Sequence, residues 1–280
     1  MQVNYLTYKI ETMRNLVKLS VLMLMAIAVS LSSCKKDENN NSTSSGSGNN
    51  DNGGVDNTEM PTTGETGTFT DSRDGKVYKT IKIGNQTWMA ENLAYIGNGM
   101  REITDDDEWK NNTAYDGWCY MNNNDSLGAV YGVLYQWESA KNACPEGWHL
   151  ATSEEWDALI DYLEDNGYSC DGKIGGEKIA KSLAVVTGWF NDSGEYSLGN
   201  SNYLEYQNLT GFLALPSGQR YVNNGNFSGI SYLATFWVKK IYQGNEYADR
   251  RALNYFDGKI QKYFTSLSEI NGCSVRCIKD

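Results

Sequence analysis

The sequence predicts an α+β fold: one loop-rich domain with two short helices and many short antiparallel strands. Three observations predict it. A β-hairpin pattern opens the domain near Lys76, two short helical patterns lie between residues 136 and 165, and β-prone stretches fill the chain after about residue 184. Helices and strands that are segregated along the chain, rather than alternating, are typical of α+β folds.

Residues 76–89 have the pattern of a β-hairpin. Val77–Ile83 is rich in β-branched residues and roughly alternates, Gly84-Asn85 is a two-residue turn signal, and Gln86–Met89 returns. Asp71–Gly75 is expected to form a turn just before it. The domain therefore begins with two paired strands.

Residues 97–128 are polar and are expected to form a loop-rich insertion. They contain the acidic run Asp105-Asp106-Asp107-Glu108. An ordered Ca²⁺ loop needs spaced oxygen ligands, usually with a glycine at the turn, and this run has neither. A solvated loop is the favoured interpretation, and the sequence gives no support to Ca²⁺ or to another cofactor.

Two helices are expected after a short strand within Tyr131–Tyr135. Gln136–Ala143 forms the first, and Cys144-Pro145 ends it before a short extended segment, Trp148–Leu150. The second begins with a capping box, Thr152 with Glu155 three residues later. Its apolar residues recur with helical spacing, at positions 156, 159, 160 and 163.

Short strands with intervening turn signals are expected in the last third of the chain. Asn223-Asn224-Gly225 and Asp257-Gly258 mark turns. The candidate strands are Phe212–Leu215, Gln219–Val222, Ala234–Lys240, Arg250–Phe256, Ile260–Phe264 and Ser274–Ile278.

The first 33 residues have the pattern of an export signal, with a possible start at Met13. A basic stretch after Met13 is followed by an apolar run from Leu19 to Leu31, which is too short to span a membrane. The run ends in Leu31-Ser32-Ser33-Cys34, which resembles the lipobox of bacterial lipoproteins. Lipid attachment at Cys34 is therefore expected, although a plain secretory signal remains the alternative.

Residues 34–66 are expected to be a disordered tether between the lipid and the domain at 67–280. Asn, Ser, Gly, Asp and Thr dominate this segment, and such residues bury too little apolar surface to offset ordering entropy. Charges directly after Cys34 resemble signals that direct lipoproteins to the outer face of the outer membrane. A solvated linker start is the alternative reading of those charges.

The formal net charge of −11 disfavours two classes of partner. Nucleic acid and anionic lipid surfaces attract basic proteins, so neither is an expected partner. Contact with a membrane is expected only through the lipid anchor. His149 is the only histidine, lies between Trp148 and Leu150, and is expected to be structural. No histidine-based catalytic motif is present, and no catalytic residue is predicted.

Several long strings resemble the Fibrobacter succinogenes major paralogous domain family. The first includes Ile83-Gly84-Asn85-Gln86-Thr87-Trp88-Met89, the second Ala143-Cys144-Pro145-Glu146-Gly147-Trp148-His149-Leu150, the third Leu213-Ala214-Leu215-Pro216-Ser217-Gly218-Gln219-Arg220-Tyr221, and the last Ser274-Val275-Arg276-Cys277. The order of cysteine, Gly-Trp-His-Leu and Glu-Glu-Trp is similar to the C-type lectin fold and to the formylglycine-generating enzyme fold. The resemblance implies a C-type-lectin-like domain in a family without a settled activity.

The lectin-like resemblance also implies a disulfide between Cys144 and Cys277. Cys273 and Cys277 are four residues apart on an expected strand, about 13 Å, which is too far for them to pair with each other. A Cys170–Cys273 bond is the next candidate, and Cys119 is then left free. No zinc site is expected, because no closely spaced cysteine pairs of the CxxC type occur.

The favoured function is non-catalytic recognition of a glycan or a protein at the cell surface, including adhesion. The candidate binding residues are Trp118, Arg220, Tyr221 and Trp237, chosen because Tyr and Trp are frequent at wet recognition surfaces. Two alternatives remain. One is an enzyme of the formylglycine-generating type, using the late cysteines Cys273 and Cys277. The other is a structural subunit of a surface appendage.

Overall fold

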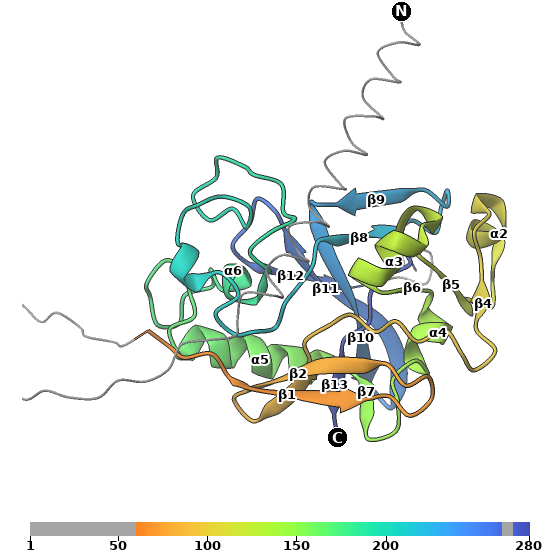
Figure 1. Ribbon diagram of the computed structural model, residues 1–280, viewed down its shortest axis with the longest axis horizontal. Helices are drawn as coiled ribbons and strands as arrows, with labels where there is room; N and C mark the ends of the chain where they lie inside the picture. The colour runs from red at the N-terminus through yellow and green to blue at the C-terminus, as the bar shows by residue number, and fades with distance from the viewer. Residues whose placement is uncertain (1–59, 265–270) are drawn as a thin grey trace, which may run out of the picture. The chain divides into compact units, whose positions relative to one another are not determined.

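A computed structural model describes residues 60–264 and 271–280, which belong to one compact unit. The expected signal segment, Cys34 and most of the expected tether lie outside the described residues. The described part is a mixed α+β fold built from three sheets and five α-helices (Figure 1). None of its helices is both long and apolar enough to cross a bilayer.

The first sheet contains the predicted hairpin and the end of the chain. Its strand order is β1-β2-β3-β13-β7, with every pair antiparallel. The Gly84-Asn85 turn joins β2 to β3 as predicted, and Gly84 has a positive φ of 57° that suits glycine. The bounds are β1 Glu65–Thr70, β2 Val77–Ile83, β3 Gln86–Met89, β7 Trp148–Leu150 and β13 Cys277–Lys279.

The second sheet is formed mainly by the long hairpin β10–β11. Its order is β12-β11-β10-β8-β9, and all neighbours are antiparallel except β8 and β10. A small third sheet has the order β4-β5-β6. The bounds are β8 Ser217–Arg220, β9 Phe227–Ile230, β10 Leu233–Tyr242, β11 Asn245–Asn254, β12 Ile260–Phe264, β4 Arg101–Glu102, β5 Gly117–Cys119 and β6 Leu134–Tyr135.

The prediction of only two helices is wrong, because three more occur in the described chain. The predicted helices are α4 and α5, and the capping box of α5 forms as expected: Glu155 N donates to Thr152 Oγ1 at 3.2 Å, and Glu155 Oε2 accepts from Thr152 N at 2.8 Å. The bounds are α2 Asp106–Asn111, α3 Asp125–Tyr131, α4 Trp137–Lys141, α5 Ser153–Asp165 and α6 Ala180–Leu183, with 3₁₀ turns η1 at Met121–Asn123 and η2 at Leu204–Tyr206.

The segment 97–128 is more ordered than the predicted loop-rich insertion. Asp105 caps α2 by accepting from Glu108 N at 2.8 Å, and the other acidic residues of the run form the first helical turn. Negative charge is favourable there because it faces the positive end of the helix dipole. The acidic run is therefore a helix start, which the solvated-loop interpretation missed.

Several predicted strands differ from the observed ones. Gln219–Val222 is observed two residues earlier, as Ser217–Arg220, and Arg250–Phe256 is part of the longer strand Asn245–Asn254. Phe212–Leu215 is not a strand, although Ala214 makes an isolated bridge with Ala184. The last strand begins at Cys277 rather than Ser274, because Cys273 and Ser274 bridge to other segments instead. The domain also begins slightly earlier than expected, since β1 starts at Glu65.

Three clusters of buried side chains form the core. The first lies around Trp88, Trp156 and Phe236, where α5 packs on β10. The second surrounds Trp148 and Trp237, and the third, smaller cluster surrounds Trp109. Tryptophan is therefore central to each cluster, which accounts for much of the aromatic content.

One disulfide joins Cys144, just after α4, to Cys277 in β13, as the resemblance implies. The predicted Cys170–Cys273 bond is wrong, because both residues are free, buried thiols, as is Cys119. Cys273 pairs through its backbone with Tyr135, and its thiol lies inside the second core cluster. Pairing the cysteines that remained unassigned in the sequence could not predict this position.

Candidate functional site

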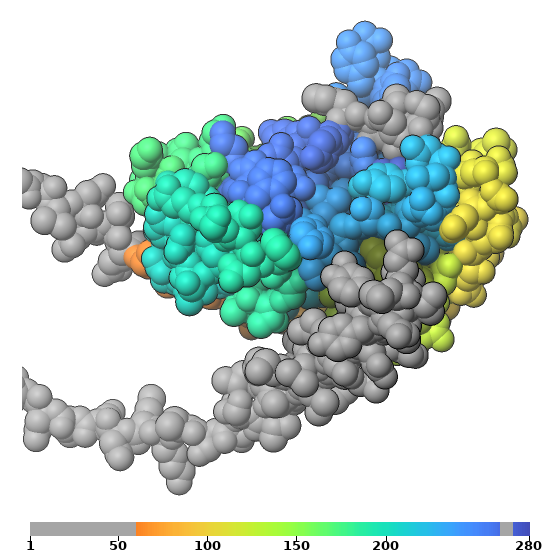
Figure 2. Space-filling model, turned by 90° about the horizontal axis from the view of Figure 1, so that it is seen from above, coloured from red at the N-terminus to blue at the C-terminus, as the bar shows by residue number. Residues whose placement is uncertain are grey.

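A hollow of about 540 Å³ opens on one face of the second sheet. Ala234, Phe236 and Val238 of β10 pack into the core beside α5. Because side chains alternate along a strand, Leu233 and Thr235 point to the other face, where the hollow lies. Figure 2 shows the light blue surface of β9 and β10 beside the darker blue of β11 and β12. The hollow is lined by Gln219, Tyr221, Val222, Asn223, Leu233, Thr235, Arg250, Asn254, Tyr263 and Asn271.

A network of hydrogen bonds orients the polar groups of the hollow. Gln219 Oε1 accepts from Arg250 Nη1 and from Asn271 Nδ2, both at 3.2 Å. Asn271 Oδ1 in turn accepts from the backbone N of Val222 at 3.1 Å. The Arg250 guanidinium lies 5.6 Å from the centre of the Tyr263 ring. Side chains from four separate segments are therefore held in place before any ligand arrives.

The lining of the hollow is mainly polar and carries one positive charge, on Arg250. Of its ten described lining residues only Val222 and Leu233 are apolar, and none is acidic. Amide, hydroxyl and guanidinium groups supply both donors and acceptors. Such a surface can bind a ligand rich in hydroxyl groups, but it has no paired carboxylates for acid–base chemistry.

Three of the four predicted binding residues are structural, which corrects that prediction. Arg220 is fully buried between the rings of Trp109 and Phe227 and donates to the carbonyl of Ile103. Trp237 and Trp118 are buried as well, and Trp237 Nε1 donates to the backbone oxygen of Tyr135 at 2.7 Å. These side chains cannot reach a ligand.

Tyr221 is the one predicted binding residue that lies at the hollow, where it is half-buried. The network residues Gln219, Arg250 and Asn271 were missed. The sequence does contain a signal for two of these segments. Polar residues an even number of positions apart on a strand lie on one face, and this spacing occurs for Gln219 and Tyr221 and for Arg250 and Asn254. Asn271 carries no such signal, since it follows no strand pattern.

The thiol chemistry required by the enzyme alternative is absent from the described residues. Cys277 is bonded to Cys144, and Cys273 is buried. Burial raises the pKa of the Cys119 thiol to about 12 and those of Cys170 and Cys273 to about 11. A thiol acts as a nucleophile or metal ligand through its thiolate, so these groups are inert near neutral pH.

His149 bridges two carboxylates at the edge of the first sheet. Its Nε2 lies 2.8 Å from Glu155 Oε1, and its Nδ1 lies 2.6 Å from Asp280 Oδ1. Glu155 also completes the capping box of α5, so the imidazole supports that helix start. Across residues 60–264 and 271–280, no group of three or more His, Cys, Asp or Glu side chains could hold a metal ion.

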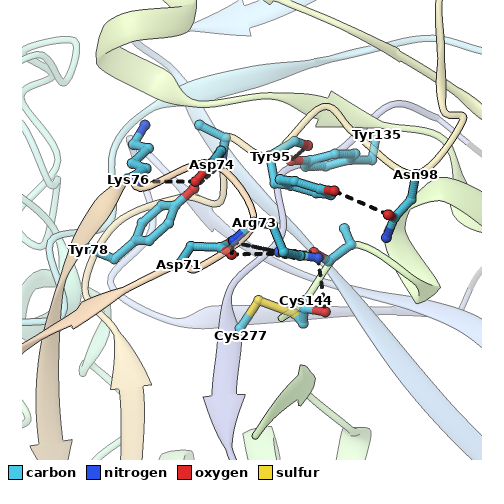
Figure 3. A network of polar contacts seen from close by, with 12 residues as sticks. Asp71, Arg73, Asp74, Lys76, Tyr78, Tyr95, Asn98, Tyr135, Cys144 and Cys277 are labelled. Carbon is cyan, nitrogen blue, oxygen red and sulfur yellow. Dashed lines mark hydrogen bonds and ion pairs between the residues drawn. A yellow bond between two sulfur atoms is a disulfide. The ribbon is translucent and has the colours of Figure 1, made fainter. Parts of the chain in front are cut away.

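A second polar network lies beside the disulfide (Figure 3). The buried Asp71 carboxylate pairs with Arg73 at 2.7 Å, and Arg73 Nη2 also donates to the carbonyl of Ala143 at 2.8 Å. The guanidinium stacks 3.6 Å from the centre of the Tyr95 ring. Arg73 therefore fastens the turn before β2 to the end of α4, next to Cys144, and its role is structural.

The Asp71 carboxyl should make the domain sensitive to acid. Burial alone would raise its pKa, but the hydrogen bonds and charge of Arg73 outweigh burial and hold the pKa below its usual value. The pair therefore stabilises the fold fully above about pH 4, and this stabilisation is lost as the pH falls through the lowered pKa. Asp71→Asn should lower the free energy of unfolding at pH 7 by about 1 to 3 kcal/mol.

Urea unfolding of wild type and Asp71→Asn between pH 2.5 and pH 7 would check this. The matched control is Asp116→Asn, whose carboxylate pairs with Arg101 but is 42 % exposed, so its loss should cost less than about 1 kcal/mol. Equal acid sensitivity in wild type and Asp71→Asn would refute the assignment.

These observations define a class: a disulfide-closed α+β domain with a preformed polar hollow and buried, unreactive thiols. The chain belongs to the Fibrobacter succinogenes major domain family, whose sequence model matches residues 81–279. The match begins within β2, runs to the end of β13 and includes every described residue that lines the hollow. Comparison with curated proteins and with solved structures found no match to this chain.

Proposed function

We propose that this protein is a surface-exposed lipoprotein whose domain is a non-catalytic binding module that recognises glycans at the hollow. The observation that carries the proposal is the lining of the hollow, with planar amide, guanidinium and tyrosine side chains oriented by one hydrogen-bond network. Sugars present hydroxyl groups that both donate and accept, so paired amide groups complement them. Preorganised groups also reduce the entropy lost on binding.

The size and composition of the hollow support this choice over an apolar small molecule. Its volume of about 540 Å³ falls within the usual range for a small-ligand site, and eight of its ten described lining residues carry polar groups. Tyr221 and Tyr263 offer ring surfaces for the C–H faces of a sugar together with a hydroxyl group. Protein recognition and adhesion through the same surface remain within the proposal.

A C-type-lectin-like architecture is part of the proposal. The Cys144–Cys277 bond joins the end of α4 to the last strand, and β13 lies between β3 and β7, so that both ends of the domain meet in one sheet. These two features support the architecture. Fold likeness does not specify a ligand, so the hollow, rather than the architecture, supports glycan binding.

Attachment to the outer membrane through lipid on Cys34 completes the proposal. The support is the apolar run and the Leu-Ser-Ser-Cys string that precede the tether. The tether would let the domain reach ligands away from the membrane. Cys34→Ala should release the protein from the detergent phase during phase partitioning, and unchanged partitioning would refute the anchor.

A glycan array probed with the detergent-solubilised whole chain would test the binding function. Wild type should bind a defined set of glycans, and Tyr221→Ala should weaken binding about tenfold, the expected loss for one good contact. Tyr247→Ala is the matched control, because Tyr247 is exposed in β11 and lies outside the hollow. Repeating the array with a Ca²⁺ chelator would show whether the ion contributes. An array without hits would refute glycan recognition.

A further inference from the structure

Four aromatic side chains form a partly exposed patch where β10 begins and β11 ends. Phe190 stacks on Tyr232 with ring centres 4.8 Å apart and an angle of 24° between the rings. The Tyr255 ring packs edge-on against both, with its centre 5.4 Å from that of Phe190 and 5.1 Å from that of Tyr232. The ring centres of Phe256 and Tyr255 are 5.2 Å apart. We call Phe190, Tyr232, Tyr255 and Phe256 the aromatic patch.

Three of these rings are partly exposed to solvent. Phe190 is 43 % exposed, Tyr232 42 % and Phe256 55 %. Only Tyr255 is largely covered, and it packs against the first core cluster. The exposed apolar surface of the other three rings would be stabilised by burial against a ligand. A contiguous patch of this kind is typical of a binding surface.

Backbone hydrogen bonds hold the patch in one arrangement. Phe190 N donates to Ser231 O at 2.7 Å, Tyr255 N donates to Tyr232 O at 2.9 Å, and Ser231 N donates to Pro216 O at 3.1 Å. Ser231 has a φ of 68°, an uncommon value for a residue other than glycine, in the turn that presents Tyr232. The rings therefore project from a fixed base that joins three segments.

The aromatic patch begins where the hollow ends. Leu233 and Asn254 line the hollow and pair with each other across β10 and β11, and the next pair outward is Tyr232 and Tyr255. Successive side chains point to opposite faces of a sheet. The patch and the hollow therefore lie on opposite faces, at the same end of the sheet. In Figure 2 the green-to-teal segment after α6 adjoins the light blue strands β9 and β10. A ligand that occupies both places must be long and must bend over this end.

We propose that the aromatic patch is a second glycan subsite, which extends the hollow so that the protein prefers long saccharide chains over short ones. The inference rests on the proposed glycan recognition and adds the substrate class, a polysaccharide. Sugar rings have apolar C–H faces that stack on exposed aromatic rings, whereas their hydroxyl groups suit the amide-lined hollow. The aromatic patch thus binds another part of the same saccharide whose first part is held in the hollow.

Calorimetric titration of the detergent-solubilised whole chain would test the extension. The probes are oligosaccharides of increasing length from the series that the array identifies. The affinity of wild type should rise with length and then level off. Phe190→Ala and Tyr232→Ala should each lower the affinity for the longest oligomer about tenfold, which corresponds to the loss of one good contact, and leave the shortest unchanged. Tyr221→Ala should weaken both, and the control Tyr247→Ala should change neither.

The outcomes separate the two ideas. If glycans bind but affinity does not depend on length, or if the patch variants weaken short and long oligomers equally, the extended subsite is refuted and the hollow stands. A patch that docks a protein instead would give this same length-independent result. If no glycan binds wild type at any length, the proposed function fails and the subsite with it. Melting temperatures of all variants should match wild type within a few degrees, and Phe190→Leu replaces either patch variant if it does not.

Discussion

Removal of the Cys144–Cys277 disulfide should lower the free energy of unfolding by about 3 to 5 kcal/mol. The bond closes a loop between residues 133 positions apart, and a long loop loses much entropy when it is closed in the unfolded chain. It also ties the end of α4 to β13, so its loss frees the strand that lies between β3 and β7. The double variant Cys144→Ala/Cys277→Ala should show this in urea unfolding at pH 7.

Cys170→Ala is the control for the disulfide. It removes a buried sulfur atom without removing a crosslink, and it should cost about 1 kcal/mol. Mild reduction of wild type should reproduce the effect of the double variant. A double variant as stable as Cys170→Ala would show that the crosslink contributes nothing to the stability of the fold.

Replacement of Arg276 should have an effect of similar size. Its guanidinium is fully buried and donates to Asn92 Oδ1 at 2.8 Å and to the carbonyls of Phe212 at 2.6 Å and Leu213 at 2.8 Å. The same group bonds Met89 O and stacks 4.6 Å from the Phe212 ring centre. Arg276 thus joins the end of β3, the loop before β8 and the last segment of the chain.

Arg276→Met should lower the free energy of unfolding by about 3 to 5 kcal/mol, because several buried acceptors lose their donor. Arg276→Lys should cost nearly as much, since one ammonium group cannot reproduce the planar fork that serves four acceptors. Lysine is also the variant to measure if methionine prevents accumulation of folded protein. Arg101→Met, at an exposed ion pair, is the control and should cost less than about 1 kcal/mol. Equal costs for Arg276→Lys and Arg101→Met would refute the assigned role.

Elements specified by neighbouring residues were predictable from the sequence. The Gly84-Asn85 hairpin and the Thr152–Glu155 capping box depend on residues within a few positions of each other, and both formed as expected. The missed helix α2 also had a local signal. Asp105 followed three residues later by Glu108 is typical of a helix start, although four acidic residues in succession also favour a solvated loop.

The candidate site was harder to predict because it depends on distant contacts. Arg220 and Trp237 resemble recognition residues by type, yet the rings and carbonyls that bury them come from elsewhere in the chain. Gln219, Arg250 and Asn271 are ordinary polar residues until the fold brings them to one hydrogen-bond network. The predicted Cys170–Cys273 bond is wrong for the same reason. It is inferred only because the other cysteines are assigned, and the sequence does not show how far apart two distant cysteines lie in the fold.

The three buried thiols give this protein built-in reporters of local opening. Cys119 lies in β5, Cys170 follows α5, and Cys273 precedes β13, so each samples a different region. An alkylating reagent can modify a buried thiol only while its region is open, and the rate of labelling then reflects how often that region opens. Mass spectrometry of labelled peptides could therefore follow regional opening of the purified protein without any substitution.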